Sequence, residues 1–115
     1  MPPNRNFIRL HRRKDILRVI REGWRIRRDS FELAWLQGEG QTLRIAVVVP
    51  LMGKRAVDRN RLRRRIRDAI DRAAVPIDLK GDAVLRARRG AYDLDFQEIQ
   101  IEVKQILSRP ERPNG

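Results

Sequence analysis

The side chains best suited to chemistry in this sequence are the arginines of one short stretch, AVDRNRLRRRIRDAI, at residues 56–70. A planar guanidinium group can hold a phosphate through two parallel hydrogen bonds, and it can also stack on a base. The acids Asp68 and Asp71 can pair with only some of these arginines, so like charges repel one another along the segment. A solvated helix face is the usual explanation of a charge run, but such faces mix both signs in closer balance. The stretch therefore predicts contact with phosphates.

Other catalytic or metal chemistry finds little support in the sequence. The chain has no cysteine, which excludes disulfides and thiolate metal sites, and His11 is its only histidine. A lone histidine in the basic segment 11–14 is better suited to solvent or to a phosphate than to a metal. Asp93 and Asp95 could form a carboxylate pair, but helix capping explains Asp95. We expect neither catalytic nor metal-binding residues in this chain.

The whole composition agrees with a polyanionic partner. In 115 residues, 27 Lys and Arg stand against 15 Asp and Glu, a net charge of +12. Such a chain attracts nucleic acid, and the predominance of arginine favours folded RNA. An anionic membrane surface is the competing partner, but the sequence has neither about 18 consecutive apolar residues nor an apolar signal segment. We therefore expect a cytoplasmic protein with no membrane contact.

The first half of the chain predicts one helix and two strands. Residues 14–22 place apolar side chains on one arc of a helix, and Gly23 follows where a left-handed cap would fall. Residues 25–37 alternate between apolar and polar positions, as in a strand with one buried face. Residues 43–49 are apolar at almost every position, as in a central strand. The glycines of the GEG at 38–40 suggest that the two strands form a β-hairpin.

The second half predicts a basic helix, a third strand and a last helix. Leu62, Ile66, Ala69, Ile70 and Ala73 recur at helical spacing before Pro76. Residues 81–88 form a strand one helix later, which suits a parallel βαβ crossover. Asp95 and Glu98 resemble a capping box that opens a helix to about residue 107.

Together these segments predict a single α+β domain. A small mixed sheet packs with about three helices in the order α-β-β-α-β-α, and the basic helix lies in the βαβ crossover. Hydrophobic residues form 41% of the chain, enough for one globular core. Residues 1–6 and 109–115 are expected to be flexible tails.

At about 100° per residue, the basic helix has two charged flanks beside its apolar arc. Arg59, Arg63 and Arg67 follow one flank, with Asn60 and Arg64 beyond them. The opposite flank carries Arg61, Arg65 and Arg72.

The segment AVDRNRLRRRIRD resembles the signature of the bacterial ribonuclease P protein subunit. Arg-Asn-Arg at 59–61 matches its centre, the pair 63–64 matches its basic pair, and the pair 67–68 matches its end. RLHRRKDILRVIREG resembles the family's N-terminal segment, and VLRARRGAYDLDFQEI resembles its last strand and helix, so the similarity covers about residues 7–107. The resemblance implies a left-handed crossover around the basic helix, against the general rule.

The resemblance also implies a function as the protein subunit of ribonuclease P. Such a protein binds the catalytic RNA and the 5′ leader of precursor transfer RNA and promotes endonucleolytic removal of the leader. It implies magnesium held chiefly by the RNA, with the active site in the RNA subunit. The RNA-binding residues that follow from it are Lys54, Arg55, Arg59, Asn60, Arg61, Arg63, Arg64 and Arg67.

The same resemblance implies that a cleft between the first helix and the sheet receives the leader. The candidate residues are Arg9, Arg12, Arg13, Ile16, Ile20 and Ala34. Ile16, Ile20 and Ala34 stand where the family usually has aromatic residues, which argues against base stacking and leaves apolar contact with the leader. Residues 50–52, Pro-Leu-Met, replace a serine and paired lysines of the family, and Lys54 and Arg55 supply that charge nearby.

Two alternatives remain open on the sequence alone. One is a non-catalytic basic RNA-binding protein such as a ribosome-associated factor, which would share the basic helix. The other is a helix-turn-helix DNA binder, which the predicted strands on both sides of the basic helix disfavour.

Overall fold

The computed structural model describes residues 7–38, 43–73 and 80–108. The predicted flexible tails, 1–6 and 109–115, lie outside the described residues. The strands are β1 (Phe7–Arg9), β2 (Trp24–Arg27), β3 (Phe31–Gln37), β4 (Leu43–Val48) and β5 (Gly81–Ala87). The helices are α1 (Arg13–Glu22), α2 (Ala56–Arg72) and α3 (Phe96–Ser108), with a 3-10 helix, η1 (Arg89–Asp93), before α3.

The strands form one five-stranded mixed sheet in the order β1-β4-β5-β3-β2. β4 pairs in parallel with β1 and β5, whereas β3 pairs antiparallel with β2 and β5. The chain leaves β4, forms α2 and returns as β5 beside β4, which confirms the predicted βαβ crossover of the basic helix. The mixed sheet and the three helices are confirmed as well.

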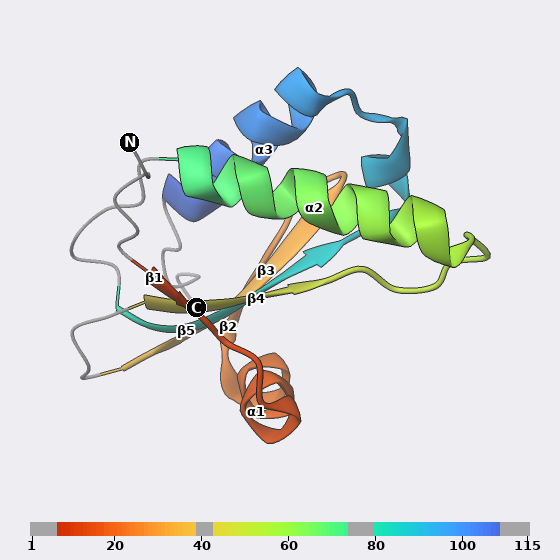
Figure 1. Cartoon of the computed structure of the whole chain (residues 1–115). Coiled ribbons are helices and arrows are strands. Elements are labelled where there is room, and N and C mark those ends of the chain that lie inside the picture. The colour runs from red at the N-terminus through yellow and green to blue at the C-terminus, as the bar shows by residue number, and fades with distance from the viewer. Residues whose placement is uncertain (1–6, 39–42, 74–79, 109–115) are drawn as a thin grey trace.

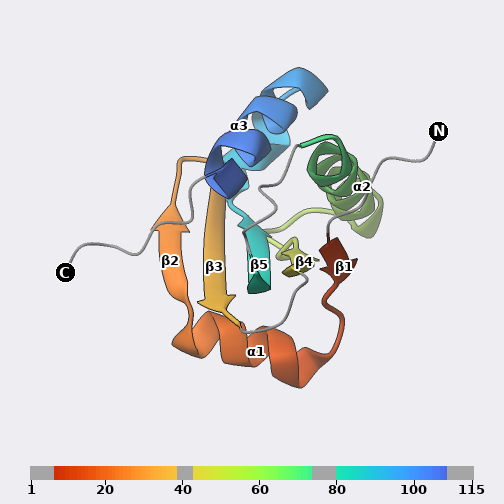
Figure 2. The same cartoon turned by 90° about the vertical axis from the view of Figure 1, so that its left-hand side faces the viewer.

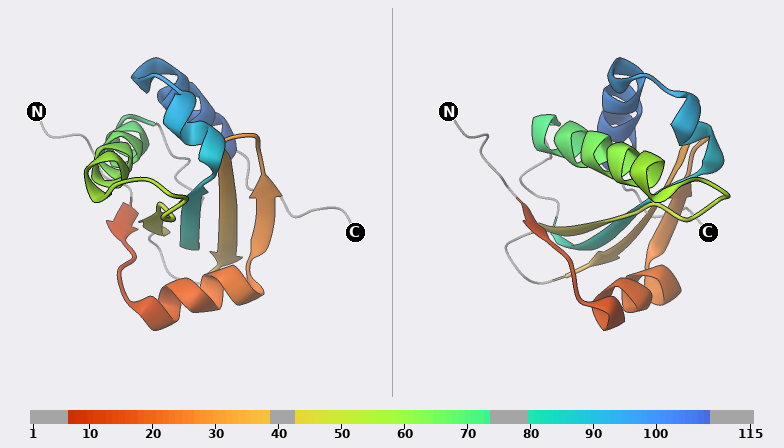
Figure 3. Two further views of the ribbon diagram at one scale, coloured as in Figure 1. Left: turned by 90° about the vertical axis from the view of Figure 1, so that its right-hand side faces the viewer. Right: turned by 45° about the vertical axis from the view of Figure 1, so that its right-hand side comes forward.

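The molecule has three layers, with the sheet in the middle (Figure 1). α2 and α3 cover one face, and α1 lies on the other face, across one end of the strands (Figures 2 and 3). The larger core lies under α2 and α3 and includes Phe31, Leu33 and Leu85 from the sheet. A smaller core under α1 joins Val19 to Ala34, Ala46 and Val84. We call the face of the sheet on which α1 packs the α1 face of the sheet.

Two predictions about the first half of the chain were wrong. The strand expected at 25–37 is two antiparallel strands, β2 and β3, because the chain turns at residues 28–30, where the Arg28 N–H donates to the Phe31 carbonyl. The hairpin expected between β3 and β4 does not form, because β5 lies between these strands. β1 was also missed, so the chain begins with a strand before α1.

The helix ends confirm one predicted cap and contradict another. Asp95 accepts a hydrogen bond from the Glu98 N–H at 2.8 Å, and Glu98 accepts one from the Asp95 N–H at 3.0 Å. This reciprocal pair is the capping box that the sequence predicted for α3. Gly23 ends α1 in an extended conformation, with φ of −76°, and not in the predicted left-handed one.

Candidate nucleic-acid interface

Helix α2 turns its apolar residues to the core and leaves its arginines on the surface. Leu62, Ile66, Ala69 and Ile70 are buried, as their spacing predicted, whereas Ala73 caps the helix. Most of the sequence-predicted RNA-binding residues lie on α2, and Lys54 and Arg55 directly precede it. The arginines that the sequence concentrates in one segment therefore lie on the outer side of α2.

One flank of α2 forms a continuous cationic surface, which we call the α2 ridge: Asn60, Arg63, Arg64 and Arg67. With Val57, these residues line a shallow depression of about 590 Å³. The Asn60 side-chain oxygen accepts a hydrogen bond from Arg63 Nη1 at 2.8 Å, which orients that guanidinium group. In the part of the chain that the structure describes, no carboxylate forms an ion pair with the arginines of this ridge.

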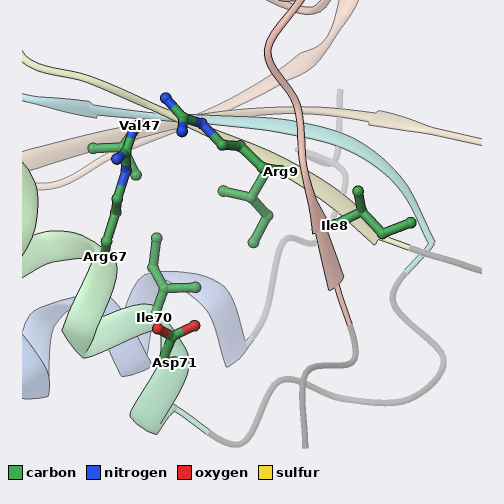
Figure 4. A pocket seen from close by; sticks show the side chains of 7 residues that line it. Ile8, Arg9, Val47, Arg67, Ile70 and Asp71 are labelled. Atoms are coloured by element: carbon green, nitrogen blue, oxygen red, sulfur yellow. The ribbon is translucent and has the colours of Figure 1, made fainter. Parts of the chain in front are cut away.

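Arg9 of β1 extends the α2 ridge across to the sheet. Figure 4 shows the guanidinium groups of Arg9 and Arg67 above a depression of about 480 Å³ between β1 and α2. Burial lowers the pKa of Arg67, and the nearby charges of Arg9 and Arg63 lower it further. The group stays protonated at neutral pH, since an arginine pKa is far above 7. The Asp71 carboxylate lines the same depression, so the two guanidinium groups are not its only charged groups.

Arg9 is therefore placed with the α2 ridge and not in a cleft beside α1. Its register partner in the sheet is Ile45, a residue of the core under α2 and α3. Side chains alternate between the two faces of a strand, so Arg9 points to the α2 side. The resemblance had grouped Arg9 with the leader-cleft candidates.

The opposite flank of α2 is more balanced in charge. Arg72 lies 3.4 Å from the Asp68 carboxylate, and its guanidinium carbon is 5.5 Å from the centre of the Phe96 ring. Phe96 is thus a half-buried aromatic at the surface. Arg61 and Arg65 are exposed on this flank beside Asp68. This side offers less uncompensated charge than the α2 ridge.

The N-terminal end of α2 carries the remaining basic candidates. Lys54 lies over the Tyr92 ring, with 5.0 Å between its ammonium nitrogen and the ring centre, and Arg55 pairs with Asp58 at 3.3 Å. Arg59 is half-buried, and its Nε is enclosed with no hydrogen-bond partner among the described residues. Burial raises the pKa of the nearby Tyr92 hydroxyl.

The other leader-cleft candidates lie in or beside α1. Arg12 and Arg13 are exposed at its N-terminal end. Ile16 and Ile20 are half-buried against the small core of the α1 face, and Ala34 is only 5% exposed beneath the helix. A ligand in this region would therefore contact the margins of α1, while Ala34 offers almost no surface.

The sequence did not predict a second group of arginines that lie together in the structure. We call this group the sheet-end cluster: Arg27, Arg86, Arg88 and Arg89. They come from β2, β5, the residue after β5, and η1, and they line one depression of about 300 Å³. These positions are distant in the sequence, so no local periodicity joins them. The two-residue spacing of Arg86 and Arg88 along one strand was the signal available, because it places both side chains on the same face.

The structure also bears on metal and membrane chemistry. Across residues 7–38, 43–73 and 80–108, no three His, Asp or Glu side chains gather as a metal ion would require. Among the same residues, no helix combines the length and the apolar character needed to cross a bilayer.

Comparisons with known proteins agree on one family. The family model described as Ribonuclease P matches residues 5–111. The ribonuclease P protein component of Streptococcus pneumoniae is 29% identical over 103 residues, which cover 90% of this chain and 83% of that protein. The solved RNase P protein from Thermotoga maritima matches with a TM-score of 0.76 and 25% identity, over 87% of this chain and 94% of that one. The Staphylococcus aureus RNase P protein shares the fold, with a TM-score of 0.74, 24% identity and coverage of 86% and 91%.

Proposed function

The chain belongs to the ribonuclease P protein family, and from this premise we propose that it binds the 5′ leader of precursor transfer RNA within the ribonuclease P complex and promotes removal of that leader. Membership makes it a protein component of an endoribonuclease complex, with the ribonuclease P RNA as its partner. The proposal concerns the substrate, the residues that bind RNA and the division of labour between protein and RNA.

The α2 ridge is the observation that carries the proposal. Its arginines are exposed or half-buried on one helix flank, and Arg9 continues the same charge onto the sheet edge. Arginines that have no carboxylate partner in the described residues gain most from phosphate oxygens, which accept their hydrogen bonds and release counterions. We assign the catalytic RNA to the α2 ridge, and Lys54, Arg55, Arg59 and Arg61 extend that contact along the helix and its N-terminal end.

The leader is assigned to the α1 face of the sheet. Arg12 and Arg13 stand at the start of α1, and the apolar margins of Ile16 and Ile20 lie beside them. In this proposal the protein holds and orients a single-stranded segment, which lowers the entropic cost of reaching the reactive geometry. The catalytic groups and the magnesium belong to the RNA.

The direct test is cleavage of precursor transfer RNA by a bacterial ribonuclease P RNA at low magnesium, with and without this protein. We expect faster cleavage at the correct 5′ position when the protein is present. At low magnesium, RNA–RNA contacts are poorly neutralised, so a cationic protein subunit has its largest effect there. Tight RNA binding without stimulation would support a general RNA-binding protein and would contradict the proposal.

A further inference from the structure

A groove lies between α2 and the start of α3, on the side of the sheet opposite α1 (Figure 1). It is a depression of about 380 Å³, and we call it the α2–α3 groove. Its lining residues are Arg61, Arg64, Arg65, Asp68 and Phe96. The sheet separates this groove from the α1 face, so a ligand here would make contacts other than those of the leader.

The α2–α3 groove is cationic. Arg61, Arg64 and Arg65 are exposed, and none of them forms an ion pair with a carboxylate of residues 7–38, 43–73 and 80–108. Asp68 is the one acid that lines the groove within these ranges, and its carboxylate lies 3.4 Å from Arg72. Asp68 leaves the groove with less uncompensated charge than the α2 ridge, but the sign of its charge is the same.

Phe96 places an aromatic ring in the wall of this groove. It is the first residue of α3, and the capping box of Asp95 and Glu98 holds the backbone there. The Arg72 guanidinium carbon lies 5.5 Å from the ring centre, but Arg72 does not line the groove. Arg72 therefore covers a different side of the ring, and the half-buried ring keeps a side that faces the groove.

The neighbouring aromatic residue, Tyr92, offers no comparable surface. Its ring already lies under Lys54, at 5.0 Å from the ammonium nitrogen, and Lys54 lines the same depression as the ring. That depression also contains the carboxylates of Asp58 and Asp93. Phe96 is therefore the aromatic side chain beside α2 that combines an open side with a cationic surrounding.

An aromatic ring among arginines is the combination with which proteins bind unpaired nucleotides. A base of any kind can stack on the ring, and guanidinium groups can hold the adjoining phosphates. The α2 ridge supplies the connection to an RNA, because Arg64 lines both the depression of the ridge and the α2–α3 groove. An RNA bound to the ridge can therefore continue around α2 without leaving cationic surface.

We propose that the α2–α3 groove binds an unpaired segment of the ribonuclease P RNA. One base of that segment stacks on Phe96, and the phosphates beside it contact Arg61 and Arg64. This inference rests on the proposed function, which places the ribonuclease P RNA on the α2 ridge.

The first test measures binding of a bacterial ribonuclease P RNA to wild-type protein and to three variants of α3. Phe96→Leu keeps an apolar side chain but removes the ring, and it should weaken binding about fivefold or more, the loss expected for one stacked base. Phe96→Tyr should keep the wild-type affinity. Ile101→Ala removes a 56% exposed apolar side chain of α3 outside the groove and should have no effect. The slope of log affinity against log salt concentration should not change in Phe96→Leu, because stacking releases no counterions.

A second test examines the phosphate contact. Arg61→Ala should make that slope shallower by about 0.7, the value for one single-stranded phosphate. Lys104 is an exposed cation on α3 that does not line the groove, so Lys104→Ala controls for net charge and should leave the slope nearly unchanged.

A third test does not depend on a variant that removes the ring. Phe96→Trp adds a tryptophan to the two in the chain, and a base stacked on it should quench its fluorescence relative to wild-type protein. Quenching should be complete when the ribonuclease P RNA is bound. Quenching that appears only after precursor transfer RNA is added would overturn the assignment to the ribonuclease P RNA.

Three results would overturn the inference: unchanged affinity in Phe96→Leu, equal losses in Phe96→Leu and Phe96→Tyr, or no added quenching in Phe96→Trp. Circular dichroism shows that each variant is folded under the binding conditions. The proposed function still stands in those cases if wild-type protein stimulates cleavage of precursor transfer RNA. Wild-type protein that does not stimulate cleavage would overturn the proposed function, and the inference with it.

Discussion

At the scale of single residues, two glycines with positive φ differ in what surrounds them. Gly81 begins β5 with φ of 116°, and a Cβ there would lie 2.2 Å from the Leu36 carbonyl oxygen. Gly53, in the turn before α2, has φ of 73°, but nothing lies within 4 Å of its Cβ position. Both conformations disfavour an L side chain, and only Gly81 adds a collision with backbone. The close approach at Gly81 lets β5 pair with β3 at its first residue.

We therefore expect Gly81→Ala to lower the free energy of unfolding by about 3 kcal/mol or more, because the backbone must shift between two paired strands. The control variant Gly53→Ala should cost only about 1 kcal/mol, the strain of one left-handed residue. Urea unfolding followed by circular dichroism measures both values. Equal losses would mean that β5 adjusts without strain.

At the scale of elements, local patterns predicted the helices better than the sheet. The apolar spacing of α2 and the capping box of α3 depend on residues a few positions apart, so the sequence shows them directly. The order of the strands does not depend on neighbouring residues, since β3 pairs with β5, which follows it only after β4 and α2. The glycines after β3 suggested a hairpin with the next strand in the sequence, and no local pattern showed that β5 takes that place. The edge strand β1, with three residues, is too short to show alternation.

The capping box gives an element-scale prediction for α3. Asp95→Ala removes the acceptor for the Glu98 N–H and leaves that donor without its partner. We expect a loss of about 1 kcal/mol in the free energy of unfolding. Gln97→Ala, an exposed change in the same turn, is the matched control and should have little effect. Thermal unfolding of the two variants measures the loss of stability in each. An equal loss in Gln97→Ala would contradict a capping role for Asp95.

The two flanks of α2 allow a similar comparison for RNA binding. Arg63 belongs to the α2 ridge, whereas Arg65 is on the flank shared with Asp68 and Phe96. Arg63→Ala should weaken binding of the ribonuclease P RNA roughly tenfold and reduce the salt slope by about 0.9, the value for one duplex phosphate. Arg65→Ala removes the same charge and should have a smaller effect on both. Binding titrations at several salt concentrations would show equal effects if only net charge mattered.

At the scale of the whole molecule, the sequence predicted that the surface is cationic but only part of where the charge gathers. The α2 ridge follows from helical spacing, so its members could be named in advance. The sheet-end cluster depends on three elements meeting at one end of the sheet, and Arg9 depends on a strand pairing that no local pattern indicates. Tertiary structure therefore adds a second group of surface arginines that could not be assigned from the sequence.

The same net charge of +12 predicts how salt affects stability. Ion pairs such as Arg18–Glu22 and Arg72–Asp68 are largely exposed, and exposed pairs contribute about 0–1 kcal/mol each. Repulsion among the arginines of α2 opposes folding and is screened by salt. The melting temperature should therefore rise between low and moderate sodium chloride. The rise should be smaller in Arg63→Ala plus Arg67→Ala than in Arg65→Ala plus Lys104→Ala, which loses the same charge outside the α2 ridge. A melting temperature that falls with salt would mean that the ion pairs outweigh the repulsion.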